Sequence, residues 1–483
     1  MRNSYDVIIA GSGIAGLHAA LCLDSRLSVL VISKSELALN NSALAQGGVA
    51  AVLDLSDDNK QLHFDDTMIA GGNTNNREAV RVLVEEGPEN VLGLAKYGVR
   101  FDERDDGSLS LTLEGGHSRH RIAHHSDTTG FEIESKLLAS ALSHANIDVL
   151  SHSTLMKLKL DDCGFYAGIF IEGRLATVRA RALIMATGGD GRVFKYTTNS
   201  TIATGDGIFL AGALGARIKN LSLVQFHPTA FAGQAAQQRF LISESVRGEG
   251  AVLLNCNGER FMQGYDPRLE LAARDVVSQA IRSEALKTGS EDFYLDISFI
   301  DHEFVKNRFP AIFKKCLEYG VDMTTDKIPV FPCQHYLMGG IDVDTYARAS
   351  IPGLYAVGEC SHTGVHGRNR LASNSLLEAL VFSKRAADDI MNNISLKASA
   401  GSFGFKLTHG AAMPHDYIGE VQDIMQSSYF IIPDKAACAR NLPRINEIFS
   451  ELENGKYADS PALLESQSLS FIAKMTITEV LNQ

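Results

Sequence analysis

Residues 5–16 read YDVIIAGSGIAG. The first six residues form a short apolar run rich in β-branched side chains, which is typical of a buried strand. The pattern G-x-G-x-x-G follows directly, and the next residues, LHAALCLDS, have the apolar spacing of a helix. Because LSVLVIS at 27–33 looks like a second strand, the chain begins with a strand–helix–strand unit. This unit predicts a Rossmann-like nucleotide-binding domain.

The glycines of this motif each have a physical role. Gly11 would make the tight turn, Gly13 would let the backbone approach a pyrophosphate, and Gly16 would let the helix pack closely on the strand. The helix N-terminus would then face the phosphates. The alternative is a tight turn with no ligand. The motif predicts six cofactor-binding residues: Gly11, Ser12, Gly13, Ile14, Ala15 and Gly16.

The end of the second strand departs from the usual pattern. An acidic residue there usually binds the ribose hydroxyls, whereas this chain has Ser33, Lys34 and Ser35, with Glu36 a little beyond. A lysine near a phosphate or an adenosine is physically reasonable. We therefore include Lys34 among the candidate cofactor-binding residues.

The chain returns to the nucleotide fold long after this first unit. RALIMATGG (181–189) and IPGLYAVGE (351–359) both look like further strands. A late return suits FAD better than NAD, because an extended cofactor takes contacts from a second part of the chain. Glu359 would then reach its ribose or ribityl hydroxyls. A helix at NSLLE, with Asn374 or Ser375 as N-cap, would aim its N-terminus at the flavin, and an ordinary capped helix is the alternative.

The stretch between these later strands, roughly 220–337, does not continue the strand–helix pattern of the nucleotide fold, since it contains segments such as QFHPTAF and the helix-like ARDVVSQAIRSEALK. We therefore expect an inserted domain there. The predicted fold class is α/β: a Rossmann-like FAD-binding domain with an inserted α+β capping domain and a C-terminal helical domain. The expected segments are 1–220 and 338–400 for the FAD-binding domain, 221–337 for the capping domain and 410–483 for the helices. Residues 393–415, rich in Gly, Ser and Ala, are the expected linker.

Length, charge and cysteine content narrow the functional classes. A chain of 483 residues is too long for one hydrophobic core. Its net charge of -12 would repel nucleic acids and anionic lipids, so we expect neither as a partner. The seven cysteines are scattered without a C-x-x-C pair, which favours a reducing cytoplasm over a disulfide framework or zinc ribbon. We find no signal-peptide pattern and no apolar run of about 18 residues, so we expect a cytoplasmic protein without a membrane span.

An ordered series of motifs resembles the succinate dehydrogenase/fumarate reductase flavoprotein family. The matching stretches are DVIIAGSGIAGL, ALAQGGVAA, DDTMIAGG, TLEGGHSRHRI, ATGGDGRVF, TGDGI, QFHPTA, SVRGEGA, GERFM, LAARDVVSQAI, HYLMGGIDVD, GLYAVGE and GVHGRNRLASNSLLEALVF. The resemblance implies bound FAD and the transfer of two hydrogens between a four-carbon dicarboxylate and the flavin. It also implies further cofactor-binding residues in or beside these motifs: Asn41, Ser42, Ala45, Gln46, Gly47, Gly48, Ala186, Thr187, Gly188, Asp206 and Leu376.

The resemblance also implies a substrate site in which arginines and histidines hold two carboxylates. These residues are His227 in QFHPTA, Arg274 in AARDVV, His335 in QHYLMGG and Arg370 in GRNRLASNS, with Ser243 in ISESVRGEG holding one carboxylate. Arginine suits the task because its planar fork donates two parallel hydrogen bonds to a carboxylate. The family assigns the proton transfer to the arginine that matches Arg274. Taken one at a time, each residue could instead be a structural histidine or a surface charge, such as a pair of Arg274 with the neighbouring aspartate.

Two positions distinguish members of this family. Members that bind FAD covalently carry a histidine shortly before A-Q-G-G, where this chain has Asn41, so the resemblance implies non-covalent FAD. Glu114, in TLEGGHSRHRI (112–122), would pair with an α-ammonium group, which a clamp of arginine and histidine alone would repel. The resemblance, with a glutamate at position 114, therefore implies FAD-dependent oxidation of L-aspartate to iminoaspartate, with O2, giving hydrogen peroxide, or fumarate as electron acceptor. The resemblance further implies quinolinate synthase, in NAD biosynthesis, as a functional partner.

Three alternatives stay open. The first is a soluble fumarate reductase or succinate-oxidising flavoprotein, and the second is a flavin-binding protein without catalysis. The third is a metal site, for which the chain offers four closely spaced histidines: His117, His120, His124 and His125. Arg119 and Arg121 are interleaved with them and would oppose a cation, so we expect no metal. The separate roles of these arginines and of the histidines beside them are not predicted, and the helices at 410–483 are expected to form a shorter domain than in other family members.

Overall fold

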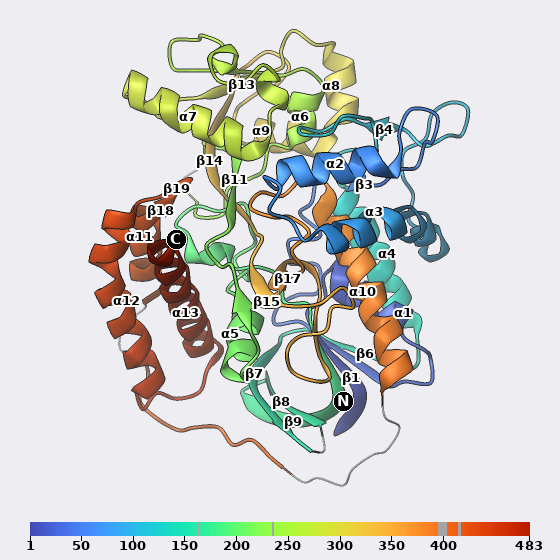
Figure 1. Ribbon diagram of the computed structural model, residues 1–483, viewed down its shortest axis with the longest axis vertical. Coiled ribbons are helices and arrows are strands. Elements are labelled where there is room, and N and C mark those ends of the chain that lie inside the picture. Colours follow the sequence, from blue (N-terminus) through green and yellow to red (C-terminus); the bar gives the residue numbers. More distant parts are fainter. Residues whose placement is uncertain (163, 234–235, 395–402, 414–416) are drawn as a thin grey trace.

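The computed structural model describes residues 1–162, 164–233, 236–394, 403–413 and 417–483. Figure 1 shows three parts: a cofactor domain around a large sheet, a capping domain above it, and a group of C-terminal helices beside it. The linker expected at 393–415 and the end of the segment expected at 338–400 lie partly outside the described residues.

A seven-stranded sheet forms the centre of the cofactor domain. Its strands follow the order β6-β2-β1-β9-β8-β7, and β16 also pairs with β9. The pairings among β6, β2, β1, β9 and β16 are parallel, whereas β7 and β8 extend the sheet in antiparallel fashion. The strands are β1 Ser4–Ala10, β2 Val29–Ile32, β6 Ile147–Leu150, β7 Ser153–Asp161, β8 Gly164–Ile171, β9 Arg174–Met185 and β16 Leu354–Ala356. The parallel strands therefore end at one common edge, which is where open α/β sheets bind their ligands.

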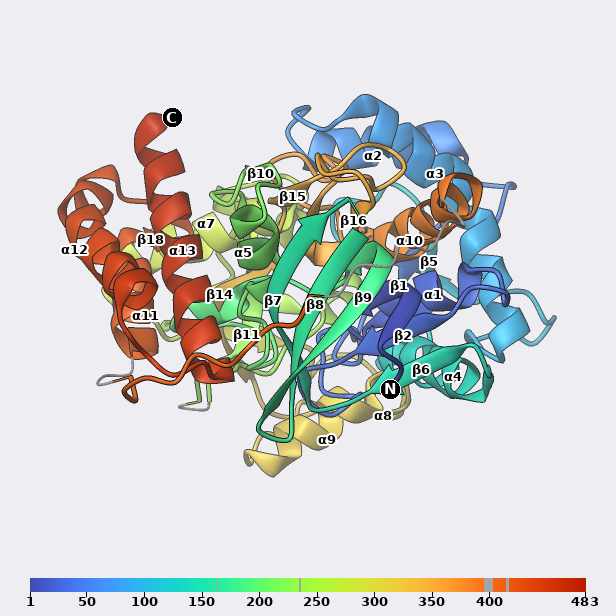
Figure 2. The same ribbon diagram turned by 90° about the horizontal axis from the view of Figure 1, so that it is seen from below.

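Helices cover both faces of this sheet because its strands are apolar on both sides. In β1, Ile8 belongs to one core while Val7 and Ile9 belong to the other, as the two-residue period of a strand requires. One face carries α1 Ile14–Cys22, α3 Arg77–Leu92, α4 Thr129–Ser143 and α10 Asn374–Asn393, and the other carries α5 Asp206–Ala213 and the C-terminal helices. Seen from below, the two groups lie on opposite sides of the sheet (Figure 2).

Three of the predicted strands differ from the observed ones at their ends. The strand predicted at 181–189 begins earlier, at Arg174, because its first half pairs with β8, and it ends at Met185. The predicted strand at 351–359 shortens to Leu354–Ala356, and that at 27–33 to Val29–Ile32. The residues beyond β9 and β16 belong instead to loops at the ligand-binding edge of the sheet.

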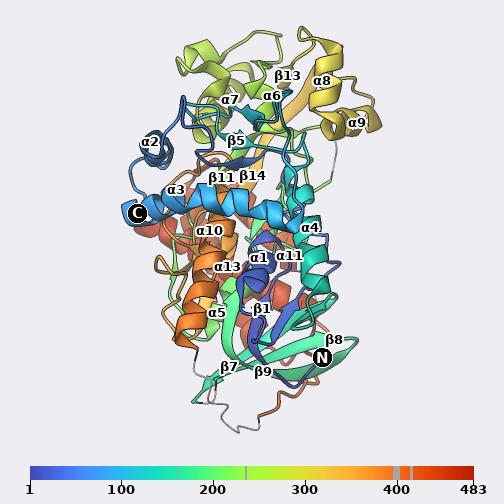
Figure 3. The ribbon, with the colours of Figure 1, turned by 90° about the vertical axis from the view of Figure 1, so that its right-hand side faces the viewer.

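The capping domain has its own antiparallel sheet and its own core. Its strands, in sheet order, are β11 Val224–Phe231, β14 Ile328–Leu337, β13 Tyr294–Asp296 and β12 Val252–Leu254. Its helices are α6 Glu244–Gly248, α7 Arg274–Thr288, α8 His302–Arg308 and α9 Pro310–Glu318. In the side view this domain stands above the cofactor domain, and α3 crosses below it (Figure 3).

Three helices follow the segment at 403–413: α11 Tyr417–Ser428, α12 Lys435–Asn454 and α13 Pro461–Asn482. The starts of α12 and α13 follow from local chemistry. The side chain of Asp434 accepts a hydrogen bond from the N–H of Ala437, and Ser460 does the same for Leu463, with a proline at the first helical position of α13. Across the described ranges, no helix is both long enough and apolar enough to cross a membrane.

Short elements complete the fold. One helix, α2 Lys60–Ala70, packs beside α3. Small sheets are formed by β3 Val49–Ala50, β5 Ile122–Ala123 and β4 Leu111–Thr112, by β10 Ile218–Lys219, β15 Gly340–Asp342 and β17 Ser361–His362, and by β18 Tyr429–Phe430 with β19 Ile432–Pro433.

Candidate active site

The glycine motif lies in the turn between β1 and α1, where the backbone is too crowded for side chains. Gly11 has φ +119°, and an added Cβ would lie 2.0 Å from the carbonyl oxygen of Ala186. A Cβ on Gly16 would lie 2.0 Å from the carbonyl oxygen of Gly11. Two backbone segments therefore meet here at a distance that only glycine allows.

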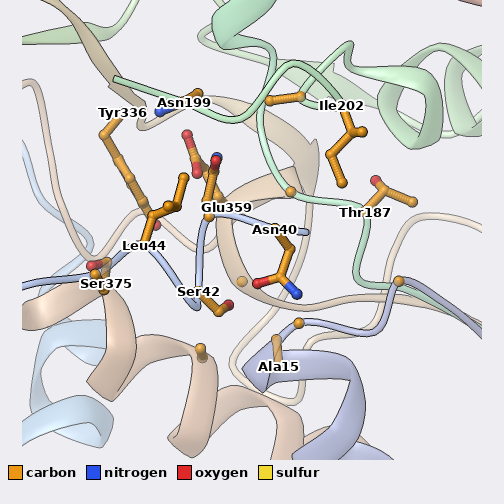
Figure 4. A pocket seen from close by; sticks show the side chains of 18 of the residues that line it. Ala15, Asn40, Ser42, Leu44, Thr187, Asn199, Ile202, Tyr336, Glu359 and Ser375 are labelled. Carbon is orange, nitrogen blue, oxygen red and sulfur yellow. The ribbon is translucent and has the colours of Figure 1, made fainter. Parts of the chain in front are cut away.

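A large cavity runs from this turn to the capping domain. Figure 4 shows Tyr336 and Ser375 on one side of it and Thr187 on the opposite side, with Glu359 between them. Eighteen of the predicted cofactor-binding residues line the cavity: Gly11, Ser12, Gly13, Ala15, Lys34, Asn41, Ser42, Ala45, Gln46, Gly47, Gly48, Ala186, Thr187, Gly188, Asp206, Glu359, Ser375 and Leu376. Ile14, Gly16 and Asn374 are not among its lining residues.

The start of α10 differs from the prediction. The prediction of Asn374 or Ser375 as N-cap is wrong, because the helix begins at Asn374 and Ser373 occupies the cap position with φ +58°. The Asn374 side chain instead forms hydrogen bonds with His63 and Thr67 behind the cavity. Ser373 is free to direct its hydroxyl toward Glu114, because it makes no side-chain cap bond.

Lys34 lines one end of the cavity but is already held by protein groups. Its ammonium donates to Thr204, to Asp206 at 2.8 Å and to Glu465 of α13 at 3.0 Å. Burial alone would lower the pKa of Lys34, but the two carboxylates outweigh burial and raise it, so the ammonium stays charged. These three acceptors occupy its three N–H donors, which the sequence did not anticipate.

Glu359 lies in the turn Gly358–Cys360, just after β16. Its carboxyl accepts a hydrogen bond from the N–H of Leu337 at 3.0 Å, which ties this turn to the end of β14. Burial raises the pKa of Glu359 to about 8. A buried, protonated carboxyl both donates and accepts hydrogen bonds, which suits contact with ligand hydroxyls.

Arg274 stands at the first residue of α7, with its guanidinium in the cavity. It donates to Glu244 at 2.6 Å and to Gln225 at 3.0 Å. A cation at a helix N-terminus opposes the helix dipole, and Glu244 offsets that cost. The surface pair with Asp275 is therefore the wrong alternative, since Arg274 is only 7% exposed and its partner is Glu244.

Arg370 reaches the same cavity from the loop before α10. It donates to Ser375 at 2.9 Å and lies over the ring of Tyr336, 4.3 Å from the ring centre. Its Nε has no hydrogen-bond partner among the described residues. Burial and the nearby charge of Arg274 lower the pKa of Arg370 to about 10, so it remains a cation at neutral pH.

His227 and His335 lie on the adjacent strands β11 and β14, with ring centres 4.9 Å apart. Burial and the charge of Arg274 hold both pKa values well below the usual range, so both rings are neutral at pH 7. The N–H of Thr229 donates to Nδ1 of His227 at 3.2 Å. The ring proton of His227 therefore sits on Nε2. This nitrogen is buried without a partner among the described residues, and it faces the cavity as a donor.

Glu114 lies beside Glu244 at this end of the cavity, and it is only 2% exposed. The hydroxyl of Ser373 donates to one carboxylate oxygen at 2.5 Å, and that of Ser245 donates to the other at 3.0 Å. Burial and the charge of Glu244 raise the pKa of Glu114 above its usual value. Ser243 also lines the cavity and donates to Ser245 at 3.2 Å.

The rest of TLEGGHSRHRI supports this loop. Arg121 is fully buried, forms a two-point pair with Asp58 at 2.8 Å and contacts Asp66 at 2.5 Å. It also lies 3.1 Å from Nδ1 of His117, whose Nε2 bonds to the carbonyl of Ala372 at 2.9 Å. The arginine and histidine thus connect the loop to the residue just before Ser373.

The outer residues of this histidine-rich stretch are used differently. Arg119 contacts Asp57 near the surface, His120 is exposed, and Nδ1 of His124 lies 3.0 Å from a carboxylate oxygen of Asp102. Within the part of the chain that the structure describes, no group of three or more His, Cys, Asp or Glu side chains is placed to hold a metal ion.

Sequence reasoning missed several residues of this site. The structure adds Gln225, Glu244, Ser245, Tyr336 and Ser373. A signal was available, because all five stand inside motifs already recognised: QFHPTA, ISESVRGEG, HYLMGGIDVD and GVHGRNRLASNSLLEALVF. The motifs did not show that the hydroxyls of Ser245 and Ser373 bond to Glu114, because Glu114 is far from both in the sequence.

These features define the class of the protein: a flavoprotein whose cofactor domain is closed by an inserted cap. Residues 6–376 match a family model described as an FAD binding domain. An L-aspartate oxidase of Clostridium perfringens is 46% identical over 396 residues, which cover 82% of this chain and 88% of that relative. An L-aspartate oxidase of Pseudomonas aeruginosa is 40% identical over 504 residues, covering 99% and 93%. The chain therefore belongs to the L-aspartate oxidase family.

The solved structures place this family in its wider group. A quinol fumarate reductase of E. coli superposes with a TM-score of 0.90 at 29% identity, covering 99% of this chain and 89% of the other. The resemblance to the succinate dehydrogenase/fumarate reductase flavoproteins is thereby confirmed, as is the predicted fold class.

The described residues fit bound FAD. Because Gly11 in the turn carries no side chain, the N-terminus of α1 is open to the cavity, as the binding of a pyrophosphate requires. Gln46 also lines the cavity, and its buried side-chain oxygen has no hydrogen-bond partner among the described residues. Glu359 and Ser375 then offer polar groups farther along the cavity, which suits a long cofactor with hydroxyls along its chain.

Proposed function

We propose that this protein catalyses the FAD-dependent oxidation of L-aspartate to iminoaspartate. One observation carries the proposal. The cavity joins unpaired donors on His227 and Arg370 to the buried carboxyl of Glu114. Donors of this kind suit carboxylates, and a buried acid beside them suits an ammonium group. L-Aspartate carries both kinds of group.

The substrate carboxylates would be held by Arg370, His227 and His335, with the hydroxyl of Ser243 on one of them. The positive charge of Arg370 is not neutralised by a direct carboxylate partner, since its hydrogen-bond acceptor is Ser375. A buried, unpaired cation gains most from an anionic ligand. The neutral histidines add donors of fixed direction.

Glu114 would receive the substrate ammonium. The hydroxyls of Ser245 and Ser373 fix its carboxylate in one orientation before the substrate arrives. Preorganisation of this kind reduces the ordering cost of binding. Because the remaining site is rich in cations, Glu114 is the group that would favour an amino acid over a plain dicarboxylate.

Arg274 would lie against the reacting part of the substrate and handle the proton. Glu244 holds it through one short hydrogen bond, and Gln225 holds a second nitrogen. Glu244 in turn accepts from Arg247 at 2.9 Å, so this carboxylate lies between two guanidinium groups. Burial would raise the pKa of Glu244, but the two arginines outweigh burial and lower it, so Glu244 stays ionised.

Bound FAD would take two electrons from the substrate and deliver them to O2, giving hydrogen peroxide, or to fumarate. The cofactor would be held without a covalent bond, because Asn41 stands where a linking histidine would be and its side chain accepts from the N–H of Ser200 at 2.7 Å. We further propose that the product passes to quinolinate synthase in NAD biosynthesis and that the protein works in the cytoplasm. The free thiols of the described cysteines are in keeping with a reducing compartment.

The test is anaerobic reduction of the purified holoenzyme, followed as loss of flavin absorbance. L-Aspartate should bleach the flavin, while D-aspartate, L-glutamate and succinate should do so far more slowly. Acid precipitation should leave the flavin in solution. Bleaching by succinate but not by L-aspartate would instead assign the protein to the succinate-oxidising flavoproteins.

A further inference from the structure

Glu114 and Glu244 lie close together in the cavity but have different partners. Both direct partners of Glu244 are guanidinium groups, on Arg274 and Arg247. Both direct partners of Glu114 are serine hydroxyls. A guanidinium can only donate, whereas a hydroxyl donates or accepts. The hydrogen bonds of Glu114 therefore survive protonation without any side-chain movement, and those of Glu244 do not.

The charges around Glu114 come from both domains. The cap contributes Glu244 on α6, Arg274 on α7 and Arg247 behind Glu244, and the loop before α10 contributes Arg370. The neutral groups that face the same space are His227 and His335, whose pKa values lie well below the usual range, and Glu359, whose pKa is about 8. At the far end Lys34 is paired with Asp206 and Glu465.

This arrangement has a simple charge balance. With Glu114 ionised, the three arginines exceed the two carboxylates by one positive charge, which matches the net charge of L-aspartate. With Glu114 protonated, the excess is two, which matches a dicarboxylate that lacks an amino group. The ligand that leaves the buried site neutral therefore depends on the protonation of this one residue.

We propose that Glu114 is a proton-linked specificity residue: it takes up a proton when a plain dicarboxylate such as succinate binds and stays ionised when L-aspartate binds. The inference rests on the proposed function and deepens it. Succinate is L-aspartate without the ammonium group, so the two ligands differ at the position facing Glu114. Dicarboxylate binding is thereby coupled to pH, and L-aspartate binding is coupled in the opposite direction.

The direction follows from linkage. Burial and Glu244 already raise the pKa of Glu114 in the protein without substrate, while Ser373, Arg274 and Ser245 lower it. Bound succinate, a dianion, would raise the pKa of Glu114 further, so succinate binds more tightly as pH falls. A substrate ammonium would lower it, so L-aspartate binding weakens as pH falls through the pKa of the free site. Linkage to one proton changes a dissociation constant by at most about tenfold per pH unit.

The experiment uses the holoenzyme and two ligands between about pH 6.5 and about pH 7.5, where succinate is a dianion and Glu359, whose pKa is about 8, stays mostly protonated. Succinate binding is read from the change in flavin absorbance, and L-aspartate from the concentration dependence of anaerobic flavin reduction. Succinate should bind several-fold to about tenfold more weakly per pH unit upward. L-Aspartate should change little or tighten over the same range.

Two variants isolate the titrating group. Glu114→Gln mimics the protonated form, so its succinate affinity should be flat with pH and close to the low-pH value of the unchanged protein. Glu134→Gln is the matched control: Glu134 is another buried acid with a raised pKa, about 7, but it bonds to Asn40 and does not line the cavity. This variant should keep the full pH dependence.

The proposal is overturned if succinate affinity is independent of pH in the unchanged protein, or if Glu114→Gln keeps the slope, which would place the proton on another group. Either result leaves the proposed function standing as long as L-aspartate reduces the flavin. Failure of L-aspartate to reduce the flavin at any pH contradicts the proposed function itself, so the two failures are distinguishable.

Discussion

The two ends of the cavity are built in different ways. At the end proposed for the cofactor, the lining includes backbone turns such as the one at Gly11, where two main-chain segments nearly touch. At the end proposed for the substrate, the lining includes charged side chains such as Arg274 and Glu114, which reach the cavity from different domains. A backbone turn is specified by neighbouring residues, whereas the charged cluster exists only after the cap is folded onto the cofactor domain. Damage to one end should therefore leave the other largely working.

The largest effect is expected from Arg274→Lys, which keeps the charge but loses the planar fork. Lysine cannot reproduce the paired contacts to Glu244 and Gln225. Turnover of L-aspartate should fall by about 10²–10⁴-fold, the range typical of a lost proton-transfer group. Steady-state kinetics would report on the substrate end of the cavity, and the flavin spectrum would report on the cofactor end.

The control for this change is Arg268→Lys, since Arg268 is exposed and pairs only with Asp266 beside it. It should keep normal turnover. If Arg274→Lys released FAD or unfolded the cap, its loss of activity would say nothing about proton transfer, and the independence of the two ends would be wrong.

Gly11→Ala should damage the opposite end. The new Cβ would lie 2.0 Å from the carbonyl oxygen of Ala186, and φ +119° is unfavourable for alanine. The backbone must move, at a cost of about 3 kcal/mol in stability or FAD binding. Thermal unfolding and the dissociation constant of FAD would both report it. Gly93→Ala is the control, because a Cβ there meets nothing within 4 Å and should be tolerated.

The same contrast explains what the sequence could predict. The first strand, the glycine turn and α1 were predicted correctly because they are consecutive and follow local rules of period and turn chemistry. Lys34 was placed at the cofactor, yet its partner Glu465 comes from α13, at the other end of the chain. No local pattern links them, because the contact arises from the packing of a helix on the sheet.

The N-cap of α10 was mispredicted for a related reason. Asn374 and Ser375 are both good capping residues, so local propensity favoured them over the residue before. The structure uses Ser373 in the left-handed region instead, since its hydroxyl is taken by Glu114 and its carbonyl by the N–H of Ala50. The tertiary contacts of the site outweigh the capping preference here.

The smallest effect is expected from the two hydroxyls that hold Glu114. Ser245→Ala or Ser373→Ala removes one contact and leaves the other, so each should raise KM for L-aspartate by about fivefold, or about 1 kcal/mol, with FAD affinity unchanged. Together they leave a buried carboxylate with neither hydroxyl, so the double variant should lose more than the two single effects combined. It should also bind succinate better than the unchanged protein near pH 8, because loss of both donors favours the protonated form of Glu114. A double variant that loses only the sum of the single effects and keeps its preference for L-aspartate would mean that the guanidinium groups, not the serines, orient this acid.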